Sequence, residues 1–151
     1  MSKNTHKTAI ARRSPSAPVK WLYANNMLNG QVLDYGCGRG FDSDYYGFKK
    51  YDPYYFPDQD VLKNRFDTVV CVYVLNVIDI SEEKQVIEKI SSILNEGGRA
   101  YFAVRRDLVS SEIKMNGYCQ RLVTLNFPSV VKTKTFEIYV LEEKKHEDSK
   151  Y

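Results

Sequence analysis

The stretch from Gln31 to Gly40 constrains the fold of this chain more than any other part of the sequence. An apolar Val-Leu pair, typical of a buried strand, precedes Asp34, which is the first acidic residue of the chain. Gly36, Gly38 and Gly40 follow, and glycines allow a tight turn and a close approach of a ligand to the backbone. A strand that ends in such a turn is typical of α/β folds that bind nucleotide-like molecules.

The spacing of these glycines distinguishes between two kinds of ligand. The dinucleotide fingerprint is G-x-G-x-x-G, but Phe41 stands where its third glycine would be, and the pattern here is G-x-G-x-G. The spacing therefore argues against NAD. A tight turn that binds no ligand is the structural alternative.

With its acid and apolar pair, the stretch resembles motif I of the class I S-adenosylmethionine-dependent methyltransferases. This resemblance implies S-adenosylmethionine (SAM) as cofactor and S-adenosylhomocysteine (SAH) as product. It implies an α/β fold with a single Rossmann-like, doubly wound sheet, mostly parallel, with a C-terminal antiparallel β-hairpin. The motif I residues that would bind the cofactor are Asp34, Tyr35, Gly36, Cys37, Gly38 and Gly40.

A second acid lies eighteen residues beyond the first. Lys49 to Asp52 is predicted to be the second strand, and an acid at this distance accepts hydrogen bonds from ribose hydroxyls in nucleotide-binding α/β folds. We expect Asp52, with Pro53, to bind the cofactor; the alternative is an Asp that only starts a turn. The resemblance also places Asp60 and Val61 beside the adenine, although the segment before the next strand is short.

The β-branched run Phe66–Leu75 predicts a central parallel strand that is covered on both faces. Ligands bind at the carboxyl ends of such strands, so Tyr73 and Val74 are expected beside the methyl donor. The chemistry would be in-line attack of a nucleophile on the sulfonium methyl group, with a base only if the nucleophile must lose a proton. The sequence does not identify that base. The candidates for catalysis are Tyr73, Asn76, His6, Arg105 and Asp107, and an ordinary surface role is the alternative for His6.

The rest of the chain shows periodic segments that predict the scaffold. We expect helices from Ser16 to about Gly30 and from a Ser81 cap to Leu94, the second stopped by Asn95–Gly98. The remaining predictions are a fifth strand at Arg99–Arg105, a short helix near Leu108–Met115, and strands at Leu122–Leu125 and Thr135–Leu141 for the hairpin.

Charge is distributed unevenly along the chain. Residues 1–33 hold Lys3, Lys7, Arg12, Arg13 and Lys20 and no acid, whereas 142–151 is a mixed charge run expected to be disordered. We therefore expect a basic arm or lid at 1–15, a methyltransferase-like domain at 16–141, and a charged tail. The arm is either a disordered leader or a segment that orders over the cofactor, in which case Lys7, Thr8, Arg12 and Arg13 would contact an anionic substrate, nucleic acid being one such substrate.

Three segments add a narrower resemblance. His6–Ala9 with the following arginines and Ser16–Val19, then Tyr51–Tyr54 and Tyr73–Ile78, resemble methyltransferases associated with DNA phosphorothioation. The likeness covers about residues 6 to 80. The Asn-Pro-Pro-Tyr and Pro-Cys motifs of standard DNA base methyltransferases are absent, so the chain does not resemble those enzymes, and the methyl acceptor stays unassigned.

Composition limits the number of domains and the classes of function that the chain can have. A chain of 151 residues that is 43% hydrophobic fits one domain, and its +3 formal charge does not by itself argue for nucleic acid. No apolar run approaches a membrane span, and the N-terminus has no apolar signal region, which predicts a cytoplasmic protein without a membrane partner. The three cysteines form no C-x-x-C pair, so no metal site is expected. A catalytically silent SAM-binding subunit that engages a protein partner is the main functional alternative, and an NAD-dependent oxidoreductase is the weaker one.

Overall fold

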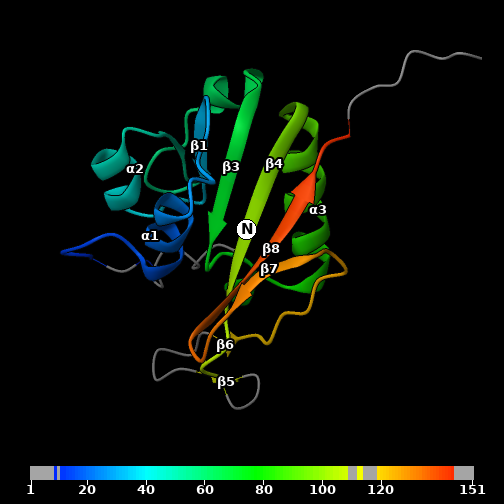
Figure 1. Cartoon of the computed structure of the whole chain (residues 1–151). Helices are drawn as coiled ribbons and strands as arrows, with labels where there is room; N and C mark the ends of the chain where they lie inside the picture. The colour runs from blue at the N-terminus through cyan, green and yellow to red at the C-terminus, as the bar shows by residue number, and fades with distance from the viewer. Residues whose placement is uncertain (1–8, 10, 109–111, 114–118, 145–151) are drawn as a thin grey trace, which may run out of the picture.

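The computed structural model describes residues 9, 11–108, 112–113 and 119–144. Its centre is a six-stranded sheet in the order β2-β1-β3-β4-β8-β7 (Figure 1). The first four strands along the chain that enter this sheet are parallel, β8 is antiparallel to β4, and β7 is antiparallel to β8. The strands are β1 (Val32–Tyr35), β2 (Lys49–Tyr51), β3 (Phe66–Val72), β4 (Leu94–Arg105), β7 (Ser129–Lys132) and β8 (Phe136–Glu142). The predicted α/β fold with a terminal antiparallel hairpin is confirmed.

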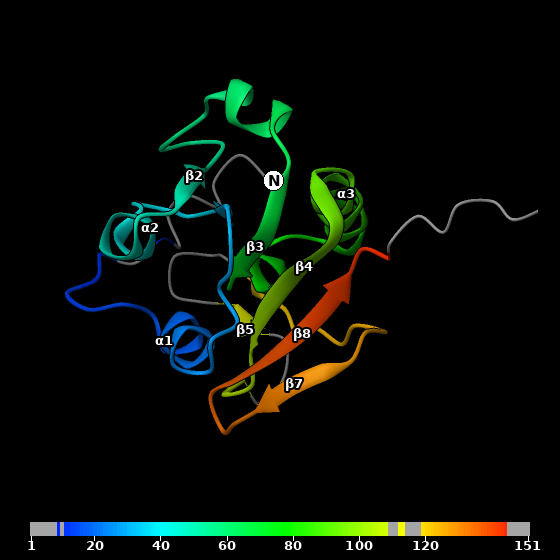
Figure 2. The same ribbon diagram turned by 45° about the horizontal axis from the view of Figure 1, so that its top comes forward.

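Helices lie on both sides of this sheet. Helix α1 (Ala17–Ala24) covers one face and α3 (Ile80–Ser92) the other, and the short α2 (Phe41–Tyr46) follows the glycine turn (Figure 2). Between β2 and β3 the chain forms only a turn and a 3₁₀ helix, η2 (Gln59–Lys63), and a second 3₁₀ helix, η3 (Leu75–Val77), follows β3. The region after the second strand therefore holds no full helix and strand, as the small number of residues before the next predicted strand indicated.

The side chains of β4 alternate between two apolar cores. Ala100, Phe102 and Val104 join the core beneath α3, while Tyr101 and Ala103 join the core beneath α1. Alternate residues of a strand point to opposite faces, so burial of both sets requires cover on both sides of the sheet. Because β1 to β4 are parallel, their carboxyl ends lie at one edge of this packed sheet.

Both long helices differ from their predictions at one end. Helix α1 ends at Ala24 rather than near Gly30, although Met27 and Leu28 still pack against the core beneath it. Helix α3 begins two residues earlier than predicted, and its cap is Asp79, whose carboxylate accepts the Glu82 N–H at 2.8 Å. The Ser81 cap is wrong because an equally good capping residue precedes it.

Strand β4 begins at Leu94, not at Arg99. Phe66 on β3 pairs with Leu94, and Thr68 pairs with Arg99, so five residues of β4 span two residues of β3. The glycines that predicted a helix stop belong to this bulge: Gly97 has φ +73°, and a Cβ on Gly98 would lie 2.8 Å from the Asn95 carbonyl oxygen.

The C-terminal region departs further from the prediction. Residues 121–125 are not a strand, and β7 takes that place beside β8. Val123 and Leu125 are instead buried in the core beneath α3, so their apolar alternation is satisfied by packing without a strand partner. Within the predicted helix at 108–115, the described residues Glu112–Ile113 form β5, which pairs with β6 (Cys119–Gln120); residues 109–111 and 114–115 lie outside the described part.

Candidate active site

The glycine turn after β1 is tied by hydrogen bonds to the end of β2. The N–H groups of Gly36 and Cys37 donate to the Tyr51 carbonyl oxygen at 2.8 and 3.1 Å. The Gly38 N–H donates to the Asp52 carboxylate at 2.8 Å. The ends of two neighbouring parallel strands therefore form one unit at the carboxyl edge.

Each glycine of the turn lies against a different segment of the chain. All three have left-handed backbones, with φ +78°, +58° and +82°. A Cβ on Gly36 would lie 2.5 Å from a methyl carbon of Val74, and a Cβ on Gly38 would lie 3.3 Å from the Cβ of Ala9. A Cβ on Gly40 would lie 3.2 Å from both the Lys50 side chain and the ring of Phe56. The turn is thus enclosed by the end of β3, the N-terminal arm and the loop after β2.

The carboxylate of Asp52 is nearly buried, with 8% of the residue exposed. Besides the Gly38 N–H, it accepts the N–H groups of Tyr54 at 2.9 Å and Tyr55 at 3.1 Å, both on Oδ1. Asp52 therefore does start a turn, which was the alternative role considered for it. A carboxylate offers about four lone-pair sites, and these three bonds leave capacity for about one further donor, on Oδ2.

Carboxylates gather beneath the turn. Asp34 is buried and accepts a hydrogen bond from the Ser43 hydroxyl at 3.0 Å. Burial, and then the neighbouring Asp42, raise the pKa of Asp34 from 3.8 to about 7; the Ser43 bond and Arg12 act in the opposite direction. Asp42 accepts both the N–H and the hydroxyl of Ser16, at 2.8 and 2.7 Å. Ser16 occupies the N-cap position of α1, as predicted, but its hydroxyl donates to Asp42 and so joins α1 to α2 instead of capping the helix. Ser43 is a site residue that its position on the buried side of α2 could have indicated.

Burial is also the main influence on the ionisation of the Cys37 thiol. It raises the pKa of the Cys37 thiol, and the nearby carboxylates of Asp34 and Asp52 raise it further. The thiol is therefore protonated at neutral pH.

Tyr73 stands directly after β3 with a left-handed backbone, φ +59°. Its N–H donates to the Ala103 carbonyl oxygen at 2.9 Å, which holds the turn against β4. The side chain is half-buried, and this burial raises the pKa of the phenol, an effect that the nearby Arg12 opposes. A left-handed backbone is uncommon for a tyrosine and often accompanies a functional role.

Asn76 has a structural environment. It is completely buried; its side-chain oxygen accepts the Arg105 N–H at 2.9 Å, and its amide nitrogen donates to the Arg121 carbonyl oxygen at 2.7 Å. Arg121, which the sequence did not single out, binds the carbonyl oxygens of Leu75 and Ile78 and the Glu83 carboxylate. Asn76 therefore joins η3, β4 and the chain after β6, and its amide cannot reach a substrate without rearrangement.

The other predicted site residues do not all lie at this edge: Arg105 ends β4 there, whereas Asp60 and Val61 lie on η2, just before the amino end of β3 (Figure 1). Arg105 donates two hydrogen bonds to Asp107, at 2.8 and 3.0 Å. Asp60 is exposed on η2 and forms an ion pair with Lys63 at 2.8 Å, while Val61 packs against the core beneath α3. Pro53 is exposed in the turn that begins at Asp52.

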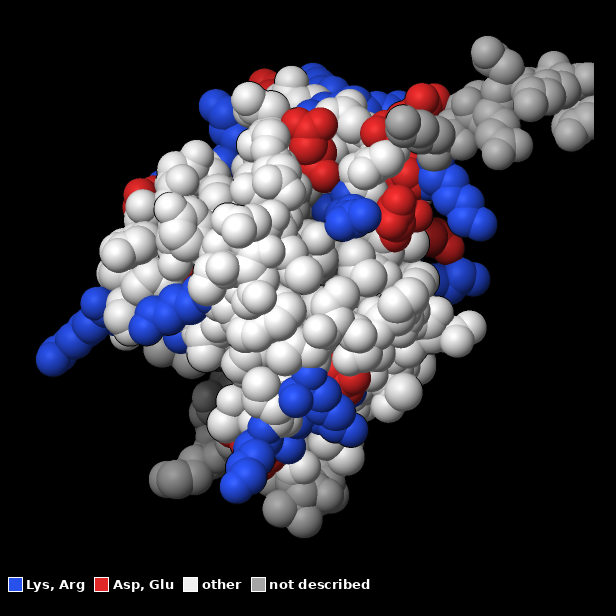
Figure 3. All heavy atoms as spheres, in the orientation of Figure 1, with Lys and Arg blue, Asp and Glu red and all other residues white. Residues whose placement is uncertain are grey.

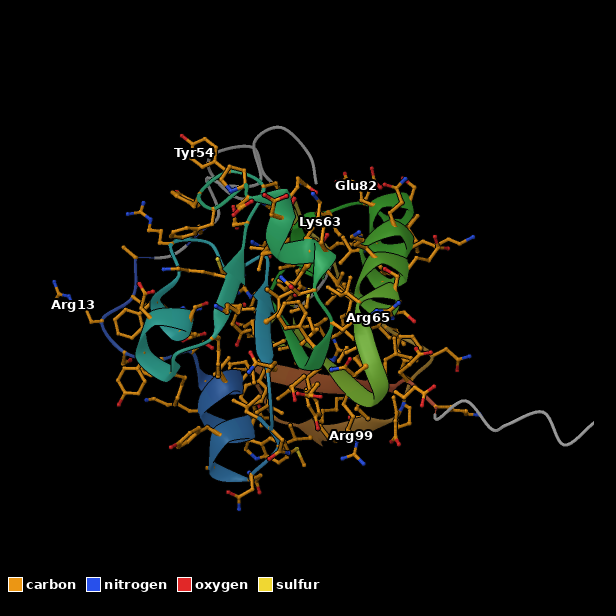
Figure 4. The ribbon with its side chains drawn as sticks, turned by 90° about the horizontal axis from the view of Figure 1, so that it is seen from above. Arg13, Tyr54, Lys63, Arg65, Glu82 and Arg99 are labelled. Carbon is orange, nitrogen blue, oxygen red and sulfur yellow. The ribbon has the colours of Figure 1, made fainter. Side chains whose placement is uncertain are left out.

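Only part of the basic arm belongs to the described residues. His6, Lys7 and Thr8 lie outside them. Arg12 is half-buried, whereas Arg13 is exposed and points away from the body of the protein (Figure 4). The two arginines, adjacent in sequence, therefore have different surroundings.

A family model described as "Methyltransferase domain" matches residues 8–129. The chain belongs to this methyltransferase family. No curated protein sequence is similar enough to count as a match.

Solved structures support the same fold. The 1,6-didemethyltoxoflavin-N1-methyltransferase of Burkholderia thailandensis, bound to 1,6-didemethyltoxoflavin and SAH, is similar with a TM-score of 0.61 at 16% identity, over 85% of this chain and 78% of that one. DhpI in complex with SAH has a TM-score of 0.56 at 12% identity, over 85% and 83% of the two chains. TehB from Haemophilus influenzae has a TM-score of 0.54 at 14% identity, over 89% of this chain and 64% of that one.

Two further observations concern the described residues alone. None of their helices is both long and apolar enough to cross a membrane. Their cysteine and acidic side chains form no group of three or more that could hold a metal ion.

Proposed function

We propose that this methyltransferase-family protein binds SAM at the glycine turn and transfers its methyl group to an acceptor at the same edge. The observation that carries the proposal is the turn itself: its glycines at the end of β1 have left-handed backbones, and one of them, Gly38, donates its N–H to the Asp52 carboxylate at the end of β2. Glycines allow close approach of a ligand to the backbone, and the remaining acceptor capacity of Asp52 suits a ribose hydroxyl. The SAH named with two of the similar structures supports the same cofactor.

The residues of this chain would bind and orient the cofactor and the acceptor rather than activate the methyl group. SAM brings a methyl group that is already activated on a sulfonium. Asp52 would hold the ribose, and the buried Asp34 would add negative charge near a cationic ligand. Tyr73, held beside the turn by its backbone bond to Ala103, would shield the transfer from water and orient the acceptor. Pro53 remains our candidate for the adenine side, since Asp60 and Val61 lie near the amino end of β3.

For the acceptor, we favour a small anionic molecule over a long nucleic acid. On the face drawn in Figure 3, Lys and Arg side chains lie mostly at the margins, around a broad uncharged region, so this face does not offer the continuous basic tract that a nucleic-acid backbone requires. The N1-methyltransferase above acts on a small molecule, which supports the same preference. The link to DNA phosphorothioation remains a hypothesis about the acceptor.

Calorimetry with SAM, SAH and NAD tests the cofactor. We expect binding of SAM and SAH and no binding of NAD; binding of NAD alone would replace the proposal with the oxidoreductase alternative. Transfer of labelled methyl from SAM to components of a cell extract then separates an enzyme from a silent SAM-binding subunit. Binding without any transfer would support the silent subunit.

A shortened protein that starts at Ser14 tests the arm. Its fold should persist because the Ser16–Asp42 hydrogen bonds that join α1 to α2 remain. Turnover should fall because Ala9, which covers Gly38, and both arginines are gone. If the shortened protein turns over like the full chain, the arm is only a leader.

A further inference from the structure

If SAM binds as proposed, the strand order fixes the direction in which it lies. The sheet order β2-β1-β3 puts the ribose acceptor Asp52 at the end of β2 and the glycine turn at the end of β1. The amino-acid part of the cofactor must then extend past the turn toward the end of β3, where Tyr73 lies. That part carries an ammonium group and a carboxylate, and both groups need partners of opposite charge or hydrogen-bonding groups.

The buried acids beneath the turn suit the ammonium group but repel the carboxylate. Asp34 and Asp42 are both buried there. A free carboxylate beside them requires a cation at close range, because an unpaired charge away from water is costly.

Arg12 is the cation held closest to this position. The contact of Ala9 with Gly38 fixes the chain three residues before it, and the bonds of Ser16 to Asp42 fix the chain four residues after it. Its charge acts to lower the pKa of both Asp34 and Tyr73, which agrees with this position of the arm.

Other cations at this edge have partners already. Arg105 is bound by both carboxylate oxygens of Asp107, and Lys50 forms an ion pair with Asp44. Arg39 lies over the ring of Tyr55, 5.9 Å from its centroid. Arg12 forms no ion pair with any carboxylate of the described residues. The N–H donors of its guanidinium group are therefore available to bind a ligand.

We propose that Arg12 binds the carboxylate of the cofactor's amino-acid part, and that the arm therefore belongs to the cofactor site as well as to the acceptor site. The geometry behind this is the fixed path of the arm between Gly38 and Asp42, which holds Arg12 beside the glycine turn at the end of β1. Arg13, which points outward, remains for the acceptor.

The test is a cycle of two ligands and two proteins. SAM is compared with decarboxylated SAM, which keeps the nucleoside, sulfonium and amine but lacks the carboxylate. Each is titrated by calorimetry into the wild-type protein and into Arg12→Gln. Because decarboxylated SAM carries more positive charge, the buried acids alone would favour it, so a preference for SAM identifies a cationic partner for the carboxylate.

We expect the wild-type protein to prefer SAM by about ten- to a hundredfold, the range of one or two charge-assisted hydrogen bonds. Arg12→Gln should abolish this preference, and Arg12→Lys should keep part of it. Lys20→Ala, which removes one exposed positive charge from α1, should keep all of it and controls for net charge. Melting curves of each variant confirm that folding is retained.

Each outcome decides between the hypotheses. Equal binding of the two ligands to the wild-type protein, or a preference that survives in Arg12→Gln, overturns the role of Arg12 and leaves the proposed function intact. Failure of the wild-type protein to bind either ligand overturns the proposed function, and the role of Arg12 with it.

Discussion

Two neighbouring turns at the carboxyl edge use the same backbone conformation with very different residues. The turn after β1 places Gly36 at φ +78°, and the turn after β3 places Tyr73 at φ +59°. Glycine adopts such angles readily, whereas a residue with a Cβ loses about 1–2 kcal/mol. The first turn therefore gains close approach at little cost, and the second keeps a side chain despite its cost. The difference leads us to predict that the tyrosine side chain itself is needed at the end of β3.

The two turns also differ in how they are held. Backbone carbonyl and carboxylate groups from the neighbouring strand end, Tyr51 and Asp52, hold the first. The second is held by one backbone bond, from the Tyr73 N–H to the Ala103 carbonyl oxygen, and by the buried side-chain amide of Asn76, which joins β4 to a segment far along the chain. Four experiments test this contrast, in order of expected effect.

Replacing Asn76 with Ala should have the largest effect on stability. It leaves the Arg105 N–H and the Arg121 carbonyl oxygen without their side-chain partner in a fully buried site. We expect the free energy of unfolding to fall by about 2–4 kcal/mol, measured by urea denaturation. A loss below about 0.5 kcal/mol would show that the amide does not hold the second turn and would return Asn76 to the catalytic candidates.

Gly36→Ala should cost about 2–3 kcal/mol, because strain of a left-handed backbone adds to a contact 2.5 Å from Val74. Gly47→Ala is the matched control: Gly47 also has positive φ, +79°, but no atom lies within 4 Å of the position that its Cβ would take. The control should lose only about 1 kcal/mol. Equal losses would mean that Val74 moves aside and that the turn is less closely enclosed than described.

The stability of the protein should depend on pH through Asp34. Burial raises its pKa from 3.8 to about 7, so between these values the folded protein keeps a proton that the unfolded chain has released. The free energy of unfolding contributed by Asp34 therefore falls as pH rises across this window. In Asp34→Asn this fall should disappear, which denaturation curves at several pH values can measure against the wild type. Parallel pH profiles of the two proteins would contradict the raised pKa.

Tyr73→Phe should have the smallest effect on stability, within about 0.5 kcal/mol, because it keeps the ring and the backbone strain. If the phenol orients the acceptor, kcat should fall while the affinity for SAH stays unchanged. Tyr73→Gly is the complementary change, since it relieves the backbone strain and removes the ring. Full turnover in both variants would show that the strain at this position serves packing alone.

The sequence predicts the first turn much better than the second. Glycine spacing and the acid that follows β2 are local signals, and the long apolar run of β3 leaves little choice of structure. The role of Asn76 depends on Arg121, which is 45 residues away in sequence, and no local pattern reports such a contact. A polar residue at a strand end looks the same whether it faces a ligand or a buried backbone group.

The wrong predictions of scaffold elements have similar causes. Asp79 and Ser81 are both good helix caps, and propensity alone does not choose between them. Gly97 and Gly98 serve a bulge as readily as a helix end. Leu122 to Leu125 alternate like a strand, but burial of Val123 and Leu125 needs no paired neighbour.

The antiparallel course of β8 separates the two ends of the described chain. Because Glu142 pairs with Arg99, at the amino side of β4, the chain leaves the sheet on the side opposite the glycine turn, whereas Ala9 touches the turn itself. Immobilising the protein on a sensor surface, or fusing it to a reporter, through the C-terminal end would leave the ligand edge open. The same attachment placed before Ala9 would bring the linker directly to Gly38, where it would compete with the ligands being measured.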